Sequence, residues 1–154
     1  MSRYMPKIVL LLSVTLAVFR GAAFAESAEQ LIRQLLMETF DKPEAQLVVE
    51  PIVVVNDHAV ADWVQGSHGG RALLKSRDGR WSLILCSGDG IKSAAALQQA
   101  GVPAPDAVKL SEGLERAEKI IPPETRALLA TFEGTVVMGA DSHHAVSDHH
   151  SSSK

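Results

Sequence analysis

Cysteine is nearly absent from this sequence of 154 residues, which contains only Cys86. No disulfide can form within the chain, and neither can a CxxC redox centre. Small exported domains that cannot bury a large core often depend on disulfides. We therefore expect packing, not covalent cross-links, to stabilise this fold.

Basic residues are fewer than acidic ones, 15 against 18. Arg3, Lys7 and Arg20 lie within residues 1–25, which contain no acidic residue. Residues 26–154 therefore carry 12 basic (15 − 3) and 18 acidic side chains, a net charge of −6 with neutral histidine. This negative charge argues against nucleic acid or an anionic membrane surface as a partner.

Long apolar runs are absent except for the 12 residues 8–19, IVLLLSVTLAVF. That length is too short to span a bilayer, which takes about 20 residues. Arg3 and Lys7 precede the run, and the small–x–small sequence Ala23-Phe24-Ala25 follows it. The arrangement predicts a signal peptide cleaved after Ala25, with an uncleaved anchor as the alternative. We expect an exported protein with no stable membrane insertion after cleavage.

The remaining 129 residues (154 − 25) are enough for one domain. Apolar residues at spacings of three and four predict a helix over residues 26–40, which Ser27 can cap. Stretches rich in β-branched residues, joined by short turns, predict an antiparallel meander. Its four expected strands are residues 46–55, 58–66, 71–76 and 80–86, with SHGG and Arg77-Asp78-Gly79 as turns.

Helical patterns return after Cys86, over residues 91–101 and 106–120, and Pro122-Pro123 opens a third helix. From residue 139 onward no apolar periodicity remains, which predicts a disordered tail over residues 139–154. The predicted fold is α+β: an N-terminal helix, a four-stranded antiparallel meander and two to three C-terminal helices. We expect a single domain over residues 26–138.

Several side chains could carry chemistry within that domain. Alternation along residues 80–86 places Trp81, Leu83 and Leu85 on one face and Cys86 with Ile84 on the other. Cys86 is expected to be a packed core thiol, although the helix that follows it could also lower its pKa. A reactive thiol would need a base; outside the tail the only histidines are His58 and His68.

Two further expectations concern charged residues near the helices. Glu112, Glu115 and Glu118 recur every three residues and are expected to form a solvated helix face. Ser87 or Asp89 is expected to cap the helix that follows the SGDG turn.

The tail concentrates imidazole groups, which are good ligands for copper, zinc and nickel. Four of the six histidines lie there: His143, His144, His149 and His150. Asp141 and Asp148 could add oxygen ligands, and Met138 a thioether suited to Cu(I). The spacing differs from structural zinc sites. The pattern indicates labile metal capture, or else a solvated spacer with incidental affinity.

Several segments together resemble the copper uptake system-associated proteins, a family of small exported bacterial proteins. They are DHAVADWVQG, GGRALL, WSLILCSGDG and AGVP, within a match that ends at LATFEGTVVM. The resemblance implies a periplasmic location, a role in copper handling and His-rich C-terminal ends. It transfers no catalytic motif, so we do not expect an enzyme.

Taken with the resemblance, the residues predict a periplasmic copper-handling accessory protein. Its tail histidines would bind copper as a labile cargo, and its body would dock a copper transporter or chaperone of the cell envelope. A metal-independent protein-interaction module of the cell envelope is the alternative. A mixed site of Cys86 with His58 or His68 would require these side chains to meet.

Overall fold

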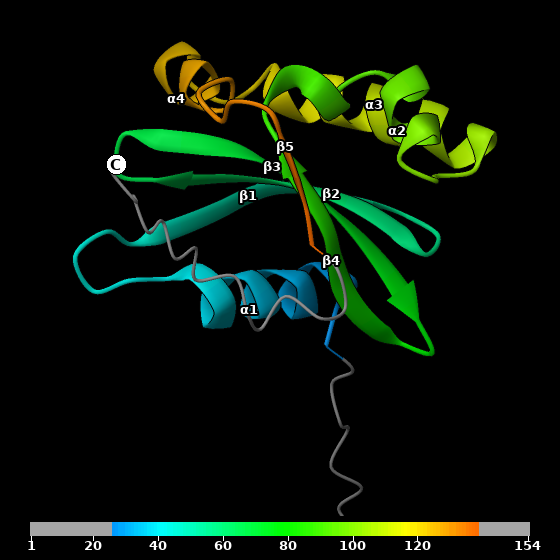
Figure 1. The fold of residues 1–154 in the computed structure, drawn as a ribbon, viewed down its shortest axis with the longest axis horizontal. Helices are drawn as coiled ribbons and strands as arrows, with labels where there is room; N and C mark the ends of the chain where they lie inside the picture. The colour runs from blue at the N-terminus through cyan, green and yellow to red at the C-terminus, as the bar shows by residue number, and fades with distance from the viewer. Residues whose placement is uncertain (1–25, 139–154) are drawn as a thin grey trace, which may run out of the picture.

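The computed structural model describes residues 26–138. The predicted signal peptide and the His-rich tail, with its four histidines, lie outside these residues. The described part has an α+β fold in which helices cover both faces of one sheet (Figure 1). None of its helices is long and apolar enough to cross a membrane.

The sheet is antiparallel throughout, with strand order β1-β2-β3-β4-β5. The elements in chain order are α1 (Ala28–Phe40), β1 (Leu47–Val55), β2 (His58–Gln65), β3 (His68–Arg77), β4 (Arg80–Ser87), the 3₁₀ turn η1 (Asp89–Ile91), α2 (Ala94–Gln99), α3 (Ala104–Glu118), α4 (Pro123–Leu128) and β5 (Thr135–Val137). The predicted α+β class and the meander of β1 to β4 are confirmed. The fifth strand was not predicted, because three exposed residues show no alternation.

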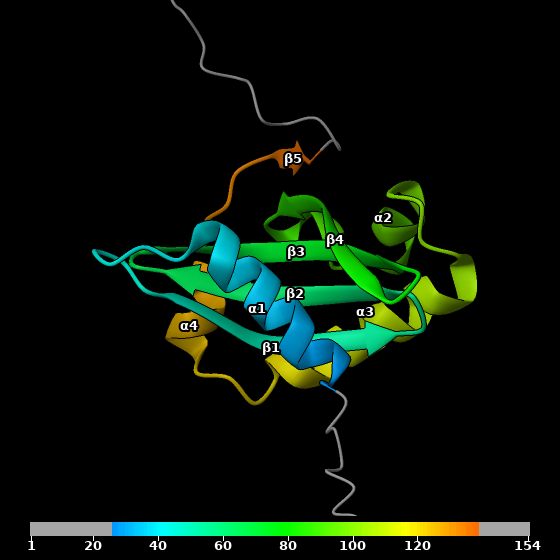
Figure 2. The same ribbon diagram turned by 90° about the horizontal axis from the view of Figure 1, so that it is seen from below.

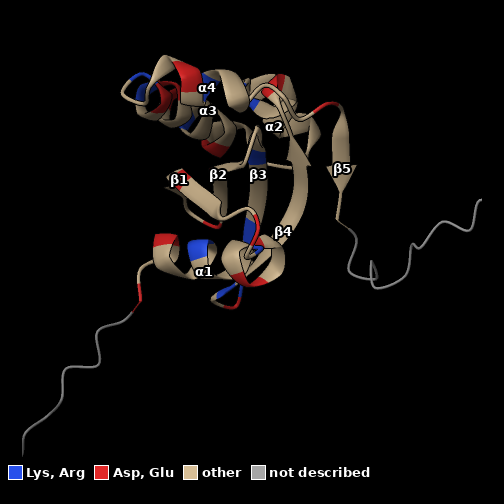
Figure 3. Ribbon diagram, turned by 90° about the vertical axis from the view of Figure 1, so that its left-hand side faces the viewer, with Lys and Arg blue, Asp and Glu red and all other residues tan. Residues whose placement is uncertain are grey.

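Helix α1 packs on one face of the sheet, and α2, α3 and α4 lie on the other (Figures 1 and 2). The α1 side buries Ile32 and Leu36 against residues such as Ala61 and Leu74. The opposite side buries Leu110 and other residues of α2 and α3 against the sheet. Charged residues gather on the helices and loops, and the strands carry few (Figure 3).

Local signals fix several element ends as predicted. Ser27 forms a capping box with Gln30 at the start of α1. Asp78 and Gly79 take positive φ angles of 53° and 75° in the β3–β4 hairpin. The capping prediction after the SGDG turn is wrong: Ser93, not Ser87 or Asp89, accepts the hydrogen bond at the start of α2.

The turn predicted at SHGG is shorter than expected. Gly66, with φ of 61°, and Ser67 make the turn, and His68 already pairs with Gln65 in the β2–β3 ladder. Gly69 and Gly70 therefore belong to β3. They leave room on the sheet for a segment that follows α4, because a Cβ on Gly70 would lie 2.9 Å from Cβ of Phe132.

A bulge in β4 overturns the predicted alternation. Leu73 pairs with Leu85, but Leu74 pairs with Leu83, so Ile84 is an extra residue in the ladder. Beyond the bulge the faces are exchanged. Leu85 consequently packs on the α2–α3 side, whereas Cys86 joins Trp81 and Leu83 on the α1 side.

Replacement of Leu110 by alanine should lower the free energy of unfolding by about 2–5 kcal/mol, because the side chain is fully buried in the α2–α3 layer. Ile120→Ala provides the matched control, since Ile120 is 87 % exposed and should change stability by less than about 0.5 kcal/mol. Urea denaturation followed by circular dichroism measures both. Equal losses for the two variants would contradict the layer assignment.

Candidate functional site: a sulfur-lined pocket and a buried ion cluster

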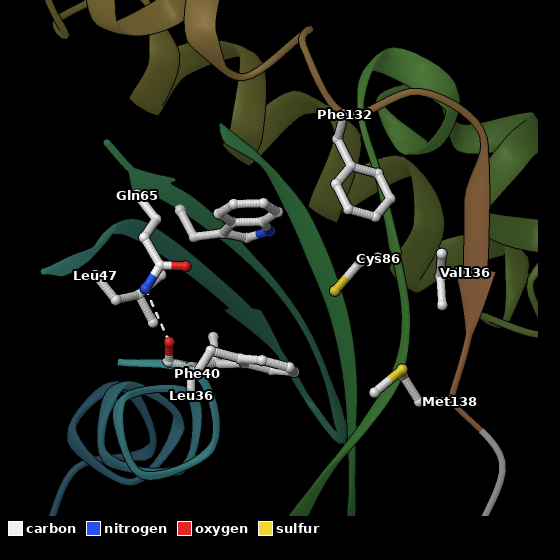
Figure 4. Close-up of a pocket in the computed structure, with 9 residues that line it drawn as sticks. Leu36, Phe40, Leu47, Gln65, Cys86, Phe132, Val136 and Met138 are labelled. Atoms are coloured by element: carbon white, nitrogen blue, oxygen red, sulfur yellow. Dashed lines mark hydrogen bonds between the residues drawn. The ribbon is translucent and has the colours of Figure 1, made fainter. Parts of the chain in front are cut away.

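An apolar pocket of about 270 Å³ lies between α1, the sheet and the segment that ends in β5 (Figure 4). Its wall combines residues from the helix, from three strands and from the segment after α4. The lining residues are Leu36, Phe40, Leu47, Trp63, Gln65, Cys86, Phe132, Val136 and Met138. Two of the nine carry sulfur, and Gln65 is the only one with a polar side-chain amide.

The two sulfur-bearing side chains come from adjoining parts of the sheet edge. Cys86 pairs with Val136 of β5, and the backbone N–H of Met138 donates to the carbonyl of Ile84 at 2.8 Å. Both side chains turn toward the cavity (Figure 4). The β4 bulge is essential to this arrangement, because without it Cys86 would face α2 and α3.

An aromatic pair forms another part of the wall. The rings of Trp63 and Phe132 meet edge to face with centroids 5.7 Å apart. The side-chain amide of Gln65 donates to the carbonyls of Phe40 and Ala45, each at 2.8 Å, and so ties the end of α1 to β2. The pocket is thus fixed on the α1 side, while its Phe132 side depends on the segment after α4.

The Cys86 thiol is not activated. Burial raises its pKa from 9.0 to about 11, so the thiol is protonated at neutral pH. His68 lines a neighbouring cleft with Glu133, not the cavity that contains Cys86. His58 lies at the far end of β2, where it pairs with Lys75, and burial followed by the charge of Lys75 lowers its pKa.

The positions of His58 and His68 test the predicted mixed site with Cys86. The structure does not bring His58 or His68 into the cavity with Cys86, so the mixed Cys/His site is not formed by the described residues. Nor does any group of three or more His, Cys, Asp and Glu side chains suited to a metal occur within residues 26–138. Met138, which lines the same cavity as Cys86, carries the second sulfur atom of that lining.

Alkylation should reveal the state of the thiol. At pH 8 iodoacetamide should modify Cys86 about 100-fold more slowly in the folded protein than in the urea-unfolded chain, because a pKa of about 11 in place of 9.0 reduces the thiolate fraction by that factor. Mass spectrometry of timed samples gives both rates. A folded-state rate equal to the unfolded one would mean an accessible, ordinary thiol.

A second feature lies on the other face of the same strands, where three charged side chains are buried. Arg71 and Asp62 are fully buried, and Glu118 is 3 % exposed. Nε of Arg71 donates to Oε1 of Glu118 at 2.7 Å but lies 3.7 Å from Oδ1 of Asp62. Its Nη1 donates to Asp89 at 3.0 Å and to the carbonyl of Leu129 at 3.3 Å.

The prediction of a solvated glutamate face is wrong for Glu118. Glu112 and Glu115 are exposed, but Glu118 turns inward to Arg71 and also pairs with Lys92 at 3.1 Å. Burial raises the pKa of Glu118, yet the hydrogen bond from Arg71 and the charges of Arg71 and Lys92 outweigh burial and lower it. The sequence offered one signal for this buried cluster: Asp62, a charged residue that lies between Ala61 and Trp63 in β2.

Asp62 is the poorly satisfied member of this cluster. Among the described residues neither of its carboxylate oxygens has a hydrogen-bond partner, and Nη2 of Arg71 also has none. Burial first, and the charge of Glu118 second, raise the pKa of Asp62 from 3.8 to about 7, against the opposing charges of Arg71 and Lys92. The folded protein therefore retains a proton on Asp62 that the unfolded chain has lost.

The free energy of unfolding should respond to this proton. Between about pH 4 and pH 7 the folded state binds more protons than the unfolded state, so Asp62 should lower stability as pH rises, by about 1.4 kcal/mol per pH unit. Above pH 7 the contribution should be constant. Asp62→Asn removes it, which raises stability relative to wild type toward pH 7 and above.

Asp78→Asn is the matched control, because Asp78 is exposed in the β3–β4 hairpin. Urea denaturation at intervals from pH 4 to pH 8 compares the three proteins. If the difference between wild type and Asp62→Asn did not change with pH, the buried carboxyl would have an ordinary pKa.

Comparison of the chain with protein-family models, with curated proteins and with solved structures finds no match. The predicted copper ligands His143, His144, His149 and His150 lie outside the described residues.

Proposed function

We propose that this protein is an exported, periplasmic copper-handling accessory protein that holds copper as a labile cargo. Its tail histidines, His143, His144, His149 and His150, collect the ion, and Cys86 and Met138 supply sulfur ligands for Cu(I) at the root of the tail. No catalytic reaction is part of this proposal. The body would dock a copper transporter or chaperone of the cell envelope.

The observation that carries the proposal is that two sulfur-bearing side chains line one apolar pocket. Cys86 and Met138 both line it. Thiolate and thioether are soft ligands, which favour Cu(I) over hard cations such as Mg²⁺ and Ca²⁺. An apolar wall limits access of water, which favours the monovalent ion and slows its oxidation. The resemblance to copper uptake system-associated proteins points to the same metal.

The position of the pocket also favours cooperation with the tail. Met138 is the last described residue, and His143 follows it by five residues. Five residues of extended chain span at most about 18 Å, so an imidazole can reach the pocket mouth from there. A third ligand from the tail would complete a trigonal set with the two sulfurs.

Binding must displace the thiol proton. With a pKa of about 11, Cys86 is protonated before the metal arrives. Formation of the copper–sulfur bond therefore releases one proton to solvent per Cu(I), and affinity should rise with pH. This cost makes the site weaker than one built on a preformed thiolate, which suits a protein that passes its cargo on.

A metal-independent interaction module is the second candidate, and β5 favours it. This strand forms the edge of the sheet, and Val136 and Val137 are 49 % and 70 % exposed. An exposed apolar edge strand can accept a strand from another protein. A partner that binds equally well to a variant lacking all copper ligands would favour this function.

Copper binding tests the first candidate. Anaerobic competition of the exported chain with a chromophoric Cu(I) chelator should show at least about tenfold weaker binding for Cys86→Ser combined with Met138→Leu. Deletion of residues 139–154 should abolish most Cu(II) binding but preserve part of the Cu(I) affinity. Met37→Leu is the control, because it removes the other thioether of the exported chain from outside the pocket.

The outcomes separate the two parts of the proposal. Unchanged Cu(I) affinity in the sulfur double variant would remove the pocket from the mechanism, and unchanged Cu(I) and Cu(II) affinity in the deletion would remove the tail. If copper affinity were unchanged in both the sulfur double variant and the deletion, the metal-independent interaction module would be the better account.

A further inference from the structure

The sulfur-lined pocket and the buried ion cluster lie back to back on the same two strands. Asp62 pairs with Arg71, and the next residue of β2, Trp63, pairs with Gly70. Successive residues of a strand point to opposite faces of the sheet. Asp62 and Arg71 therefore face the C-terminal helices, and Trp63 and Gly70 face the pocket side.

A single segment, residues 129–134, contacts both features. Its first residue, Leu129, accepts a hydrogen bond from Nη1 of Arg71. Its Phe132 packs on Gly70 and on the ring of Trp63, and lines the pocket. The segment is also tied to the sheet by Gly69, whose N–H donates to Oγ1 of Thr131 at 3.0 Å.

The charged groups near Asp62 come from β3, α3 and the turn after β4. Arg71 is on β3, Glu118 ends α3, Asp89 begins η1 and Lys92 follows it. From α4, Arg126 donates to the backbone carbonyl of Glu118 at 3.2 Å. With Asp62 protonated, Arg71 and Lys92 balance Glu118 and Asp89. Ionisation of Asp62 adds one buried negative charge beside Glu118.

Arg71 has an unused donor with which to respond. Its Nη2 has no acceptor among the described residues, and the two oxygens of Asp62 have no donor. A buried carboxylate without hydrogen bonds is strongly unfavourable. If the Arg71 guanidinium rotated so that two of its N–H groups faced the Asp62 carboxylate, Nη2 and the carboxylate oxygens would all be hydrogen-bonded. That turn would draw Nη1 away from Leu129 and weaken the contact with Glu118.

We propose that Asp62 is a proton-operated latch on the pocket. In its protonated form Arg71 stays clamped to Glu118 and to the Leu129 carbonyl, and Phe132 closes the pocket wall. Loss of the proton turns Arg71 toward Asp62 and removes the hydrogen bond to Leu129, so residues 129–134 keep fewer contacts with the sheet and the cavity opens more often. As regulation of copper access the latch rests on the proposed function, but the opening itself requires no metal.

The direction of the response follows from the raised pKa of Asp62, about 7. The open population grows as pH rises toward 7 and is constant above about pH 7. Opening lets Asp62 reach Arg71 and water, which lowers its pKa in the open state. Each pH unit between the two pKa values enlarges the open population about tenfold.

Hydrogen exchange on the exported full chain without copper tests the latch. After correction for the intrinsic pH dependence of exchange, the amides of Ala130 and Thr131, which donate to the carbonyls of Ala127 and Leu128, should lose about tenfold protection between pH 6 and pH 8 in wild type and in Asp78→Asn. In Asp62→Asn their protection should not depend on pH. An identical pH response in Asp62→Asn, or none in wild type, would overturn the proposal.

A second measurement uses the wild type alone and does not depend on the folding of a variant. The carboxyl carbon of Asp62 and the amides of Thr131 and Phe132 should titrate with one midpoint near neutral pH in NMR spectra. Separate midpoints, or amides that do not respond, would show that the proton leaves the segment in place. Both experiments are carried out without metal. Failure of the latch can therefore be distinguished from failure of the protein to bind copper.

Discussion

The guanidinium of Arg71 is the group on which the arrangement of the C-terminal half depends. It is fully buried, and its hydrogen bonds reach the end of α3, the 3₁₀ turn after β4 and the last turn of α4. Removing it would leave the buried Glu118 with its pairing to the partly exposed Lys92 but without its 2.7 Å hydrogen bond from Arg71, and breaking a buried ion pair is strongly destabilising. Apolar packing holds α3 on the sheet, but this one side chain sets where the chain leaves α4 on its way to β5.

The features that could be predicted from the sequence are those that depend on local residues alone. The capping box at Ser27, the β-branched strands and the Asp78-Gly79 hairpin depend on neighbours in the chain, and the structure has them as expected. The bulge at Ile84 depends on how Leu73 and Leu74 pair across the sheet, and the burial of Glu118 depends on Arg71 being opposite. Neither partner is visible in a local pattern, so the predicted face of Cys86 was wrong.

The candidate site shows the same division. The tail histidines were predicted from composition, and the individual sulfur-bearing residues were noticed, but their presence in one pocket was not predicted. It requires β5, whose three residues pair with β4 and place Met138 in the lining of the pocket that contains Cys86, more than fifty residues away in sequence. The soft character of the pair then follows from ordinary ligand chemistry.

The short length of β5 has a mechanical consequence. Three residue pairs and one further backbone hydrogen bond, from Met138 to Ile84, attach the outer wall of the pocket to the sheet. Residues 139–154 follow directly after Met138, so a force applied to them acts first on this three-pair ladder and not on the longer ladders of β1 to β4. Separation of β5 would remove Val136 and Met138 from the pocket wall and uncover Cys86, while β1 to β4 stayed paired.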